Sequence, residues 1–269
     1  MYFQPSWRVL TVGDGDLSFS YSLKQRCPSL QLQASVLDSE SALSAKYQTH
    51  FAQSLQRTGV PVHFGIDITD PASWKGKIVD VFDVVIFQFP LIPQLLKIKG
   101  MEEYDRAVQH NLQHRRLLRY FLVHSALHLL CEKGARLSYI SSKDVKPYSH
   151  WDIENAITLN TGIRYLGKTP FDASDYSEYQ VRNVNRDNYV ADTRGYTYVY
   201  SDKTHHENAF SLIKPTQRSG DYCRLCNKGP FGDKKQRDAH ILSPRHQRMQ
   251  TFDQAWHNYL TTVSKKEKS

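Results

Sequence analysis

The chain has 269 residues, 40% of them hydrophobic, which is enough for one medium-sized α/β domain and a small second unit. Lys and Arg outnumber Asp and Glu by 35 to 27, and the resulting formal net charge of +8 modestly favours a polyanionic partner. No apolar run approaches a membrane span and no secretory leader is visible. We therefore expect no membrane partner and an intracellular protein, cytoplasmic in a bacterium and nuclear or nucleolar in a eukaryote.

The four cysteines do not form the framework of a disulfide-rich protein. Cys27 and Cys131 are isolated in apolar or helical contexts, so we expect ordinary core thiols. Cys223 and Cys226 form a close pair, which indicates a different role.

Residues 8–20 are predicted to form a strand, a tight turn and a helix. Gly13 and Gly15 allow a sharp turn and the close approach of a ligand, and Asp16 and Ser18 are suitable N-caps for the helix. Such a turn at the carboxyl end of a first parallel strand is the usual nucleotide crevice of an open α/β sheet.

Three interpretations of this turn remain open: a methyl-donor site, a dinucleotide site and a turn without a ligand. Gly13, Gly15 and Ser18, followed by Asp38, approximate the dinucleotide fingerprint. However, the carboxylates of Asp14 and Asp16 would repel a pyrophosphate. S-adenosylmethionine has no phosphate and carries a sulfonium and an ammonium, so the charges favour the methyl donor.

The next two predicted strands also end at carboxylates. A strand over 32–37 ends at Asp38, which suits both hydroxyls of a ribose, with the capping of a helix over 40–56 as the alternative. A third strand over 60–67 ends at Asp67.

The fourth predicted strand, over 82–90, is a continuous apolar run suited to the centre of a parallel sheet. Pro90 cannot continue the ladder, so Gln88 and Phe89 should project at the carboxyl edge beside the glycine turn. An amide there can bond the edge of a base and a ring can stack on its face. The alternative is a strand end with a packed phenylalanine.

A long helix is predicted over 102–131. Its basic cluster either contacts RNA phosphates or forms a solvated face, and consists of His114, Arg115, Arg116 and Arg119.

The remaining elements complete an α/β pattern. We expect a fifth strand over 136–140, a helix over 151–159, and last strands over 165–167 and 196–200. The segment 172–194 is too long for a hairpin loop and is predicted to be an insert on the substrate side.

Four segments together resemble the large-subunit rRNA (uridine-N(3)) methyltransferase family: residues 13–20, 82–90, 147–151 and 171–176. The resemblance covers roughly residues 7–187. It implies a Rossmann-like, seven-stranded S-adenosylmethionine-dependent fold with helices on both faces of the sheet. It also implies N(3) of a uridine in ribosomal RNA as the substrate. The alternatives are tRNA or another base, and an RNA-binding protein with an inactive methyltransferase fold.

The resemblance also assigns site residues. The family usually reads Asn-Phe-Pro-His where this chain has Gln88-Phe89-Pro90-Leu91, so the identity of the target base and of its proton acceptor stays open. The methyl donor is implied to contact Gly13, Asp14, Gly15, Asp16, Ser18 and Phe19, with Asp38 at the ribose and Asp67 and Ile68 at the adenine, while Gln88, Phe89 and Pro90 form the target-base edge.

The C-terminal part carries a second motif. Cys223, Cys226, His240 and His246 supply two thiolates and two imidazoles, which fill the tetrahedral shell of a structural Zn²⁺. The motif resembles zinc fingers of RNA-binding proteins, and Pro244 is consistent with a break in the helix between the two histidines. A redox Cys-x-x-Cys or unrelated surface histidines are the alternatives.

These features predict four regions in a monomeric protein. They are a methyltransferase domain over 1–203, a linker over 204–219, a C2H2-type zinc finger over 220–250, and a helix and tail over 251–269. The finger carries seven basic and three acidic residues, a balance that suits contacts with RNA phosphates.

Overall fold

The computed structural model describes residues 1–92, 102–179, 181, 195–204, 212–214 and 220–266. Its centre is a seven-stranded sheet in the order β3-β2-β1-β4-β5-β7-β6, in which β7 is antiparallel to both of its neighbours. The predicted sheet is thereby confirmed. The strands are β1 (Arg8–Val12), β2 (Gln31–Ser35), β3 (Val62–His63), β4 (Val84–Gln88), β5 (Leu137–Ser142), β6 (Arg164–Phe171) and β7 (Gly195–Ser201).

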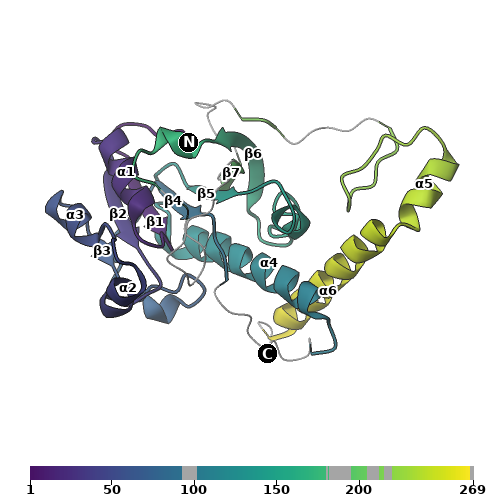
Figure 1. Cartoon of the computed structure of the whole chain (residues 1–269), viewed down its shortest axis with the longest axis horizontal. Coiled ribbons are helices and arrows are strands. Elements are labelled where there is room, and N and C mark those ends of the chain that lie inside the picture. Colours follow the sequence, from purple (N-terminus) through teal and green to yellow (C-terminus); the bar gives the residue numbers. More distant parts are fainter. Residues whose placement is uncertain (93–101, 180, 182–194, 205–211, 215–219, 267–269) are drawn as a thin grey trace.

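Helices lie on both faces of this sheet (Figure 1). The α-helices are α1 (Ser18–Arg26), α2 (Glu40–Lys46), α3 (Ala52–Arg57), α4 (Arg106–His124), α5 (Lys234–Ile241) and α6 (Pro244–Lys266). Short turns of other helical types are η1 (Pro71–Ser73), η2 (Ser125–Leu129), η3 (Tyr148–Trp151) and η4 (Ala173–Asp175).

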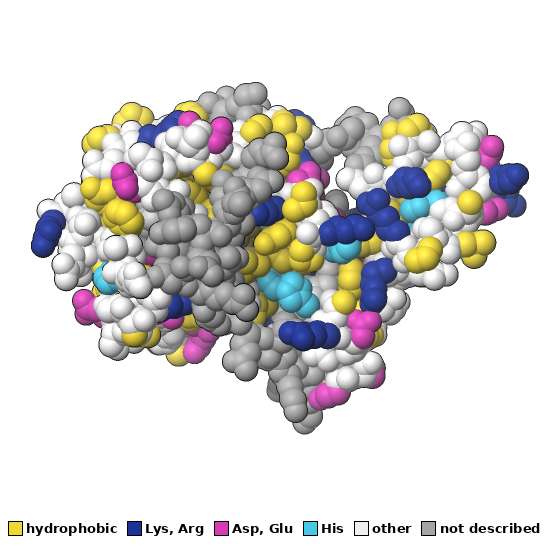
Figure 2. Space-filling view, in the orientation of Figure 1, with side chains coloured by type: hydrophobic (Ala, Val, Ile, Leu, Met, Phe, Trp, Pro, Cys, Tyr) yellow, Lys and Arg dark blue, Asp and Glu magenta, His cyan; other side chains and the backbone are white. Residues whose placement is uncertain are grey.

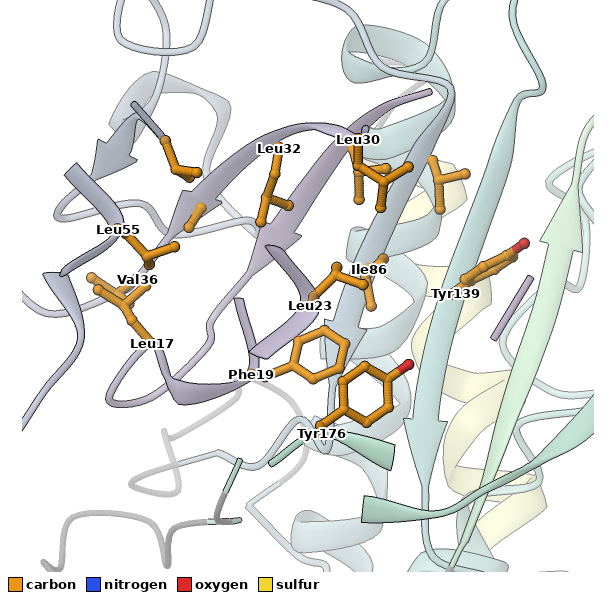
Figure 3. Packing of buried hydrophobic residues seen from close by; sticks show 14 of the residues in the cluster. Leu17, Phe19, Leu23, Leu30, Leu32, Val36, Leu55, Ile86, Tyr139 and Tyr176 are labelled. Atoms are coloured by element: carbon orange, nitrogen blue, oxygen red, sulfur yellow. The ribbon is translucent and has the colours of Figure 1, made fainter. Parts of the chain in front are cut away.

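The central strands are buried on both faces because their side chains alternate between two cores. Val9 and Ile86 face the core that α1, α2 and α3 cover, whereas Leu10 and Phe87 face the core that α4 covers. In the first core Phe19 of α1 packs against Tyr176, with ring centroids 5.1 Å apart (Figure 3). Both faces of β1 and β4 are thus fixed, which holds their carboxyl ends in place.

The helix predicted over 40–56 is wrong as a single element, because residues 47–51 separate α2 from α3. The Phe51 N–H donates to the Asp16 carbonyl at 2.9 Å, which ties this segment to the glycine turn. Ser39, not Asp38, caps α2, since its hydroxyl accepts from the Ala42 N–H at 3.2 Å. A tertiary contact therefore overrides the helical pattern.

Other predicted boundaries also shift. The third strand shrinks from 60–67 to β3, and the predicted helix over 151–159 forms irregular turns. The long helix ends at His124 and passes into η2, because residues 129–131 pair with Phe82 at the start of the central strand. Cys27 and Cys131 are both partly exposed. Cys27 still packs against the edge of the first core, whereas the prediction of a core thiol is wrong for Cys131.

Helix α6 runs from the Cys/His group to α4, so the proposed boundary at residue 250 falls inside one helix (Figure 1). The Trp256 indole is fully buried and donates to the Ala156 carbonyl at 2.9 Å. Two apolar clusters join α6 to the methyltransferase domain, and they include Leu112, Tyr259 and Leu260 in one, and Val108, Met249 and Phe252 in the other.

Parts of the predicted insert and linker, residues 180, 182–194, 205–211 and 215–219, lie outside the described residues. Within the linker, Ile213 pairs with Lys168 at the edge of β6. Among the residues that the structure does describe, no helix has both the length and the apolar character needed to cross a membrane.

Candidate functional site

The glycine turn follows β1 directly. Gly13 has a φ of +63°, and a Cβ at this position would lie 2.7 Å from Phe87 Cε2, so only glycine fits. Leu17, not Asp16 or Ser18, occupies the N-cap position of α1, with a φ of 68°. Its side chain is fully buried, and this packing explains the left-handed backbone. Asp16 instead accepts from the N–H and the hydroxyl of Ser18, at 3.1 and 2.7 Å.

Asp14 is a buried acid within this turn. Its carboxylate accepts from the Ser20 N–H at 2.7 Å and from the Ser20 hydroxyl. Burial raises the pKa of Asp14 to about 8, although the Ser20 hydrogen bonds oppose the shift. The protonation of Asp14 therefore responds to a cation placed beside it near neutral pH.

A cavity of about 460 Å³ opens at the carboxyl ends of β1, β2 and β4, within the range of small-molecule sites. Ser18 and Phe19 do not line it. Ser18 holds Asp16, and Phe19 packs in the core. The predicted site residues that line the cavity are Gly13, Asp14, Gly15, Asp16, Asp38, Asp67, Ile68, Gln88, Phe89 and Pro90.

The far wall of the cavity carries an ion pair. Asp38 accepts from Lys46 Nζ at 3.0 Å, and both residues line the cavity. Asp67 Oδ1 accepts from the Thr69 N–H and hydroxyl at 2.8 and 2.7 Å. Sequence reasoning missed Lys46, although it lies two helical turns after Asp38 and so on the side of α2 that faces this carboxylate.

Gln88 ends β4 at the cavity. Its side chain is 6% exposed, and neither amide atom has a hydrogen-bond partner among the described residues. The amide lies near the Tyr179 hydroxyl and lowers the pKa of Tyr179 against the larger effect of burial. Among the described residues, this buried amide therefore has hydrogen-bonding capacity that a polar ligand could use.

Phe89 has a φ of 44°, and its N–H donates to the Ser141 carbonyl at 3.0 Å. Its ring packs against Phe171 with a centroid separation of 5.3 Å while also lining the cavity. This contact orients the Phe89 ring. Of the three residues predicted to form the target-base edge, only Gln88 has a polar side chain.

Helix α4 supplies part of the cavity wall, where the sequence analysis singled out only Arg116, within the basic cluster. Gln113, Arg116 and Leu117 line the cavity, at the spacing of one helix face. Tyr179 and Val181 line it from the described part of the predicted insert.

Neither interpretation of the basic cluster holds for His114 and Arg115, which are each 1% exposed. His114 stacks on Trp151 at 4.3 Å, and burial lowers its pKa to about 3, so it stays neutral. Arg119 donates to the carbonyls of Ile157 and Leu159 at 3.3 and 2.5 Å. Of these four residues, only Arg116 lines the cavity.

The four C-terminal cysteine and histidine side chains come together. Their ligand atoms all lie within 4.8 Å of one another, and His246 Nδ1 is 3.4 Å from Cys223 Sγ and 3.6 Å from Cys226 Sγ. His240 lies on α5 and His246 on α6, which begins at Pro244. The predicted break between the two histidines is therefore present.

The strand order and the glycine turn after β1 are those of the Rossmann-like methyltransferase class that the sequence predicts. Within this class, residues 10–183, more than half of the chain, match the family model described as BMT5-like, rRNA (uridine-N3-)-methyltransferase BTM5-like. The chain belongs to this family.

A curated relative is "Heavy metal-associated isoprenylated plant protein 41" of Arabidopsis thaliana, which is 28% identical over 182 residues covering 66% of this chain and 33% of that protein. The chain thus spans about a third of the length of this relative. Two similar solved structures are the 16S rRNA (adenine(1408)-N(1))-methyltransferase from Catenulisporales acidiphilia and precorrin-6y C5,15-methyltransferase from Geobacter metallireducens. The first is 11% identical to this chain, the match covers 73% of this chain and 87% of the other, and the TM-score is 0.40. The second is 10% identical, the match covers 74% of this chain and 80% of the other, and the TM-score is 0.39.

Proposed function

We propose that this protein transfers a methyl group from S-adenosylmethionine to N(3) of a uridine in ribosomal RNA. The single observation that carries the proposal is that the glycine turn, Asp38 and the buried Gln88 amide line one cavity. The family supports the class of reaction and of substrate.

The donor half of the cavity suits a cationic ligand. Gly13 and Gly15 leave the backbone open to close approach, and Asp14 and Asp16 face a ligand that carries positive charge. Asp38 is placed to accept hydrogen bonds from ribose hydroxyls. S-adenosylmethionine supplies an electrophilic methyl group next to the strand edge.

The base half is formed by Gln88 and its neighbours. The Nε2 donor of Gln88 suits O2 or O4 of uracil, an interaction that would leave N(3) free to face the methyl group. The imide nitrogen loses its proton as the N–C bond forms and the S–CH₃ bond breaks, so the enzyme must position the base and allow the proton to leave. Arg116 lies in the same cavity, and its positive charge stabilises an adjacent uracil anion.

The Cys/His group suits a structural Zn²⁺. A tetrahedral site with ligand distances of about 2.0–2.3 Å places ligand atoms roughly 3.3–3.8 Å apart, which is close to the observed Sγ–Nδ1 distances of 3.4 and 3.6 Å. His240 Nε2 is buried without a hydrogen-bond partner among the described residues, as expected of an atom that binds a metal. We propose that Cys223, Cys226, His240 and His246 hold the ion and brace the start of α6.

The experiment is methyl transfer from labelled donor to purified rRNA and tRNA pools, followed by mass spectrometry of the nucleosides. We expect 3-methyluridine in the rRNA pool. The same mark only in tRNA, or on another base, would overturn the substrate assignment. Normal donor binding with no methylation of any pool would favour an RNA-binding protein with an inactive methyltransferase fold.

A further inference from the structure

Basic side chains from two distant parts of the chain meet around His150. The pKa of His150 is lowered by burial and then by the positive charges of Lys146, Arg245, Arg115 and Arg248. The Phe252 ring of α6 links these groups, with its centroid 5.7 Å from the His150 ring and 5.8 Å from the Arg248 guanidinium carbon. Loop 143–147, η3 and the start of α6 therefore form one surface.

Arg224, from the segment that holds the two cysteines, extends this surface. Cys223 and Leu225, on either side of Arg224, pack against the apolar cluster that contains Phe252, which holds this segment beside the start of α6. Figure 2 shows Lys and Arg side chains gathered around histidines on this face. We call Lys146, Arg224 and Arg245 the junction cations.

The acids nearby only partly neutralise this surface. Asp105 pairs with Arg248 at 2.6 Å, and Asp253 lies 3.8 Å from Arg115. The junction cations are all exposed, and no carboxylate of the described residues lies within ion-pair distance of them. Arg245 donates to the Cys226 carbonyl at 3.3 Å, a bond that orients its guanidinium and keeps its charge.

This surface lies on the same side of the sheet as the cavity. β5 runs parallel to β4, and the Ser141 carbonyl near its end accepts from the N–H of Phe89. The loop that carries Lys146 therefore leaves the sheet beside Gln88 and Phe89. The packing of α6 on α4 holds Arg245 at a fixed distance from that edge.

We propose that the junction cations form one phosphate-binding site, shared between the methyltransferase domain and the Cys/His module, for the RNA strand whose base enters the cavity. The inference rests on the proposed function. Three exposed cations that form no ion pair with a described carboxylate, at the edge where the target base enters, complement the phosphates that flank this base. The site places the strand, whereas Gln88 contacts the base.

The test compares Lys146→Glu and Arg224→Glu, singly and together, with Arg57→Glu as the matched control. Arg57 is an exposed cation at the end of α3. Arg245 is left unchanged because its hydrogen bond supports the Cys226 carbonyl. We measure the Kd for a uridine-containing rRNA fragment at several salt concentrations, and the donor Kd by calorimetry.

Each single variant should weaken RNA binding about fivefold and reduce the logarithmic salt slope by about 0.7–0.9. The double variant should weaken it further, and donor affinity should stay unchanged in all. RNA binding equal to that of Arg57→Glu would overturn the proposal. The zinc content of each variant checks that it has folded. Lys146→Gln removes the positive charge without adding a negative one. If Lys146→Glu loses RNA affinity but Lys146→Gln does not, the loss comes from repulsion by the new glutamate, and this result would also overturn the proposal.

The two proposals fail in different ways. If the variants lose RNA affinity but wild-type protein neither binds the donor nor methylates RNA, the phosphate site stands and the proposed function falls. If methylation proceeds and the variants bind RNA normally, the opposite holds.

Discussion

Arg115 of α4, which is 1% exposed, directs its guanidinium Nη1 toward Asp253 of α6 at 3.8 Å. Its Nη2 donates to the His150 carbonyl at 3.2 Å. This arginine therefore connects α4, η3 and α6. These contacts fix the Cys/His module to the methyltransferase domain. Removing α6 would expose both the buried charge and the apolar clusters around Trp256.

Asp253→Asn should destabilise the protein, because it removes one of the two carboxylates, Asp152 and Asp253, that offset the buried Arg115 charge. The loss should be about 1–3 kcal/mol, less than for a fully buried pair because Asp253 is partly exposed. Urea unfolding measures it. Asp221→Asn, which breaks the exposed pair with Arg237, is the control and should cost less than about 1 kcal/mol. Equal effects would show that the Arg115 pair contributes little.

Donor binding should strengthen as pH rises through the region of the Asp14 pKa of about 8. The cationic donor favours the ionised carboxylate, so binding below this pKa must release a proton. Calorimetry in buffers of different ionisation enthalpy measures that release, and Asp14→Asn should abolish it. A wild-type affinity that does not change from about pH 6 to about pH 9 would contradict the assignment.

The Asp14 carboxyl should also affect the stability of the protein in the absence of ligand. The folded-state pKa of Asp14 lies above the ordinary aspartate value of 3.8, so the folded state binds more protons than the unfolded state between these two pKa values. The Asp14 contribution to the free energy of unfolding should therefore fall as pH rises from about 4 to about 8. Asp14→Asn should remove this part of the pH dependence.

Asp38→Ala should weaken donor binding at least tenfold, or about 1.4 kcal/mol, because it removes the acceptor proposed for the ribose. It also leaves Lys46 without its partner in the cavity wall. Asp80→Ala, outside the residues that line the cavity, is the control and should bind normally. Tight NAD binding by wild-type protein, with no heat from the methyl donor, would refute the donor assignment.

Gln88→Leu should abolish methyl transfer while leaving donor affinity within about twofold. It removes a buried amide that has no hydrogen-bond partner among the described residues, so the free energy of unfolding of the variant should not fall. Gln88→Asn restores the residue that the family usually has and should retain activity. If Gln88→Leu methylates RNA at the wild-type rate, the amide does not bind the base.

Chelation of zinc should lower the melting temperature and weaken RNA binding, because we propose that the ion braces the start of α6. Donor affinity should stay within about twofold. Metal analysis of the purified protein should show one zinc per chain, and Cys226→Ser should reduce it. Chelation without effect on stability would refute a structural metal site. Deletion of 220–269 is a poorer test, because it also strips α6 from α4.

The sequence by itself determined the elements whose signal is local. A β-branched run ending in glycine predicted β1 and its turn because glycine tolerates the left-handed backbone at Gly13. Parallel strands end at the same edge of a sheet, so the sequence alone could place Asp38, Asp67 and Gln88 at one cavity. The spacing of Cys223, Cys226, His240 and His246 likewise predicted their convergence.

Only the tertiary structure decided which polar groups are buried and which residues form their hydrogen bonds and ion pairs. Arg115 and Arg116 are neighbours on one helix, yet α6 covers the first and the cavity borders the second. Leu17 displaces Asp16 and Ser18 from the N-cap because its side chain fills the core, and the bond from Phe51 to Asp16 divides a helix. Such outcomes depend on contacts between residues far apart in the chain, whose free energies exceed the local preferences of about 1 kcal/mol or less.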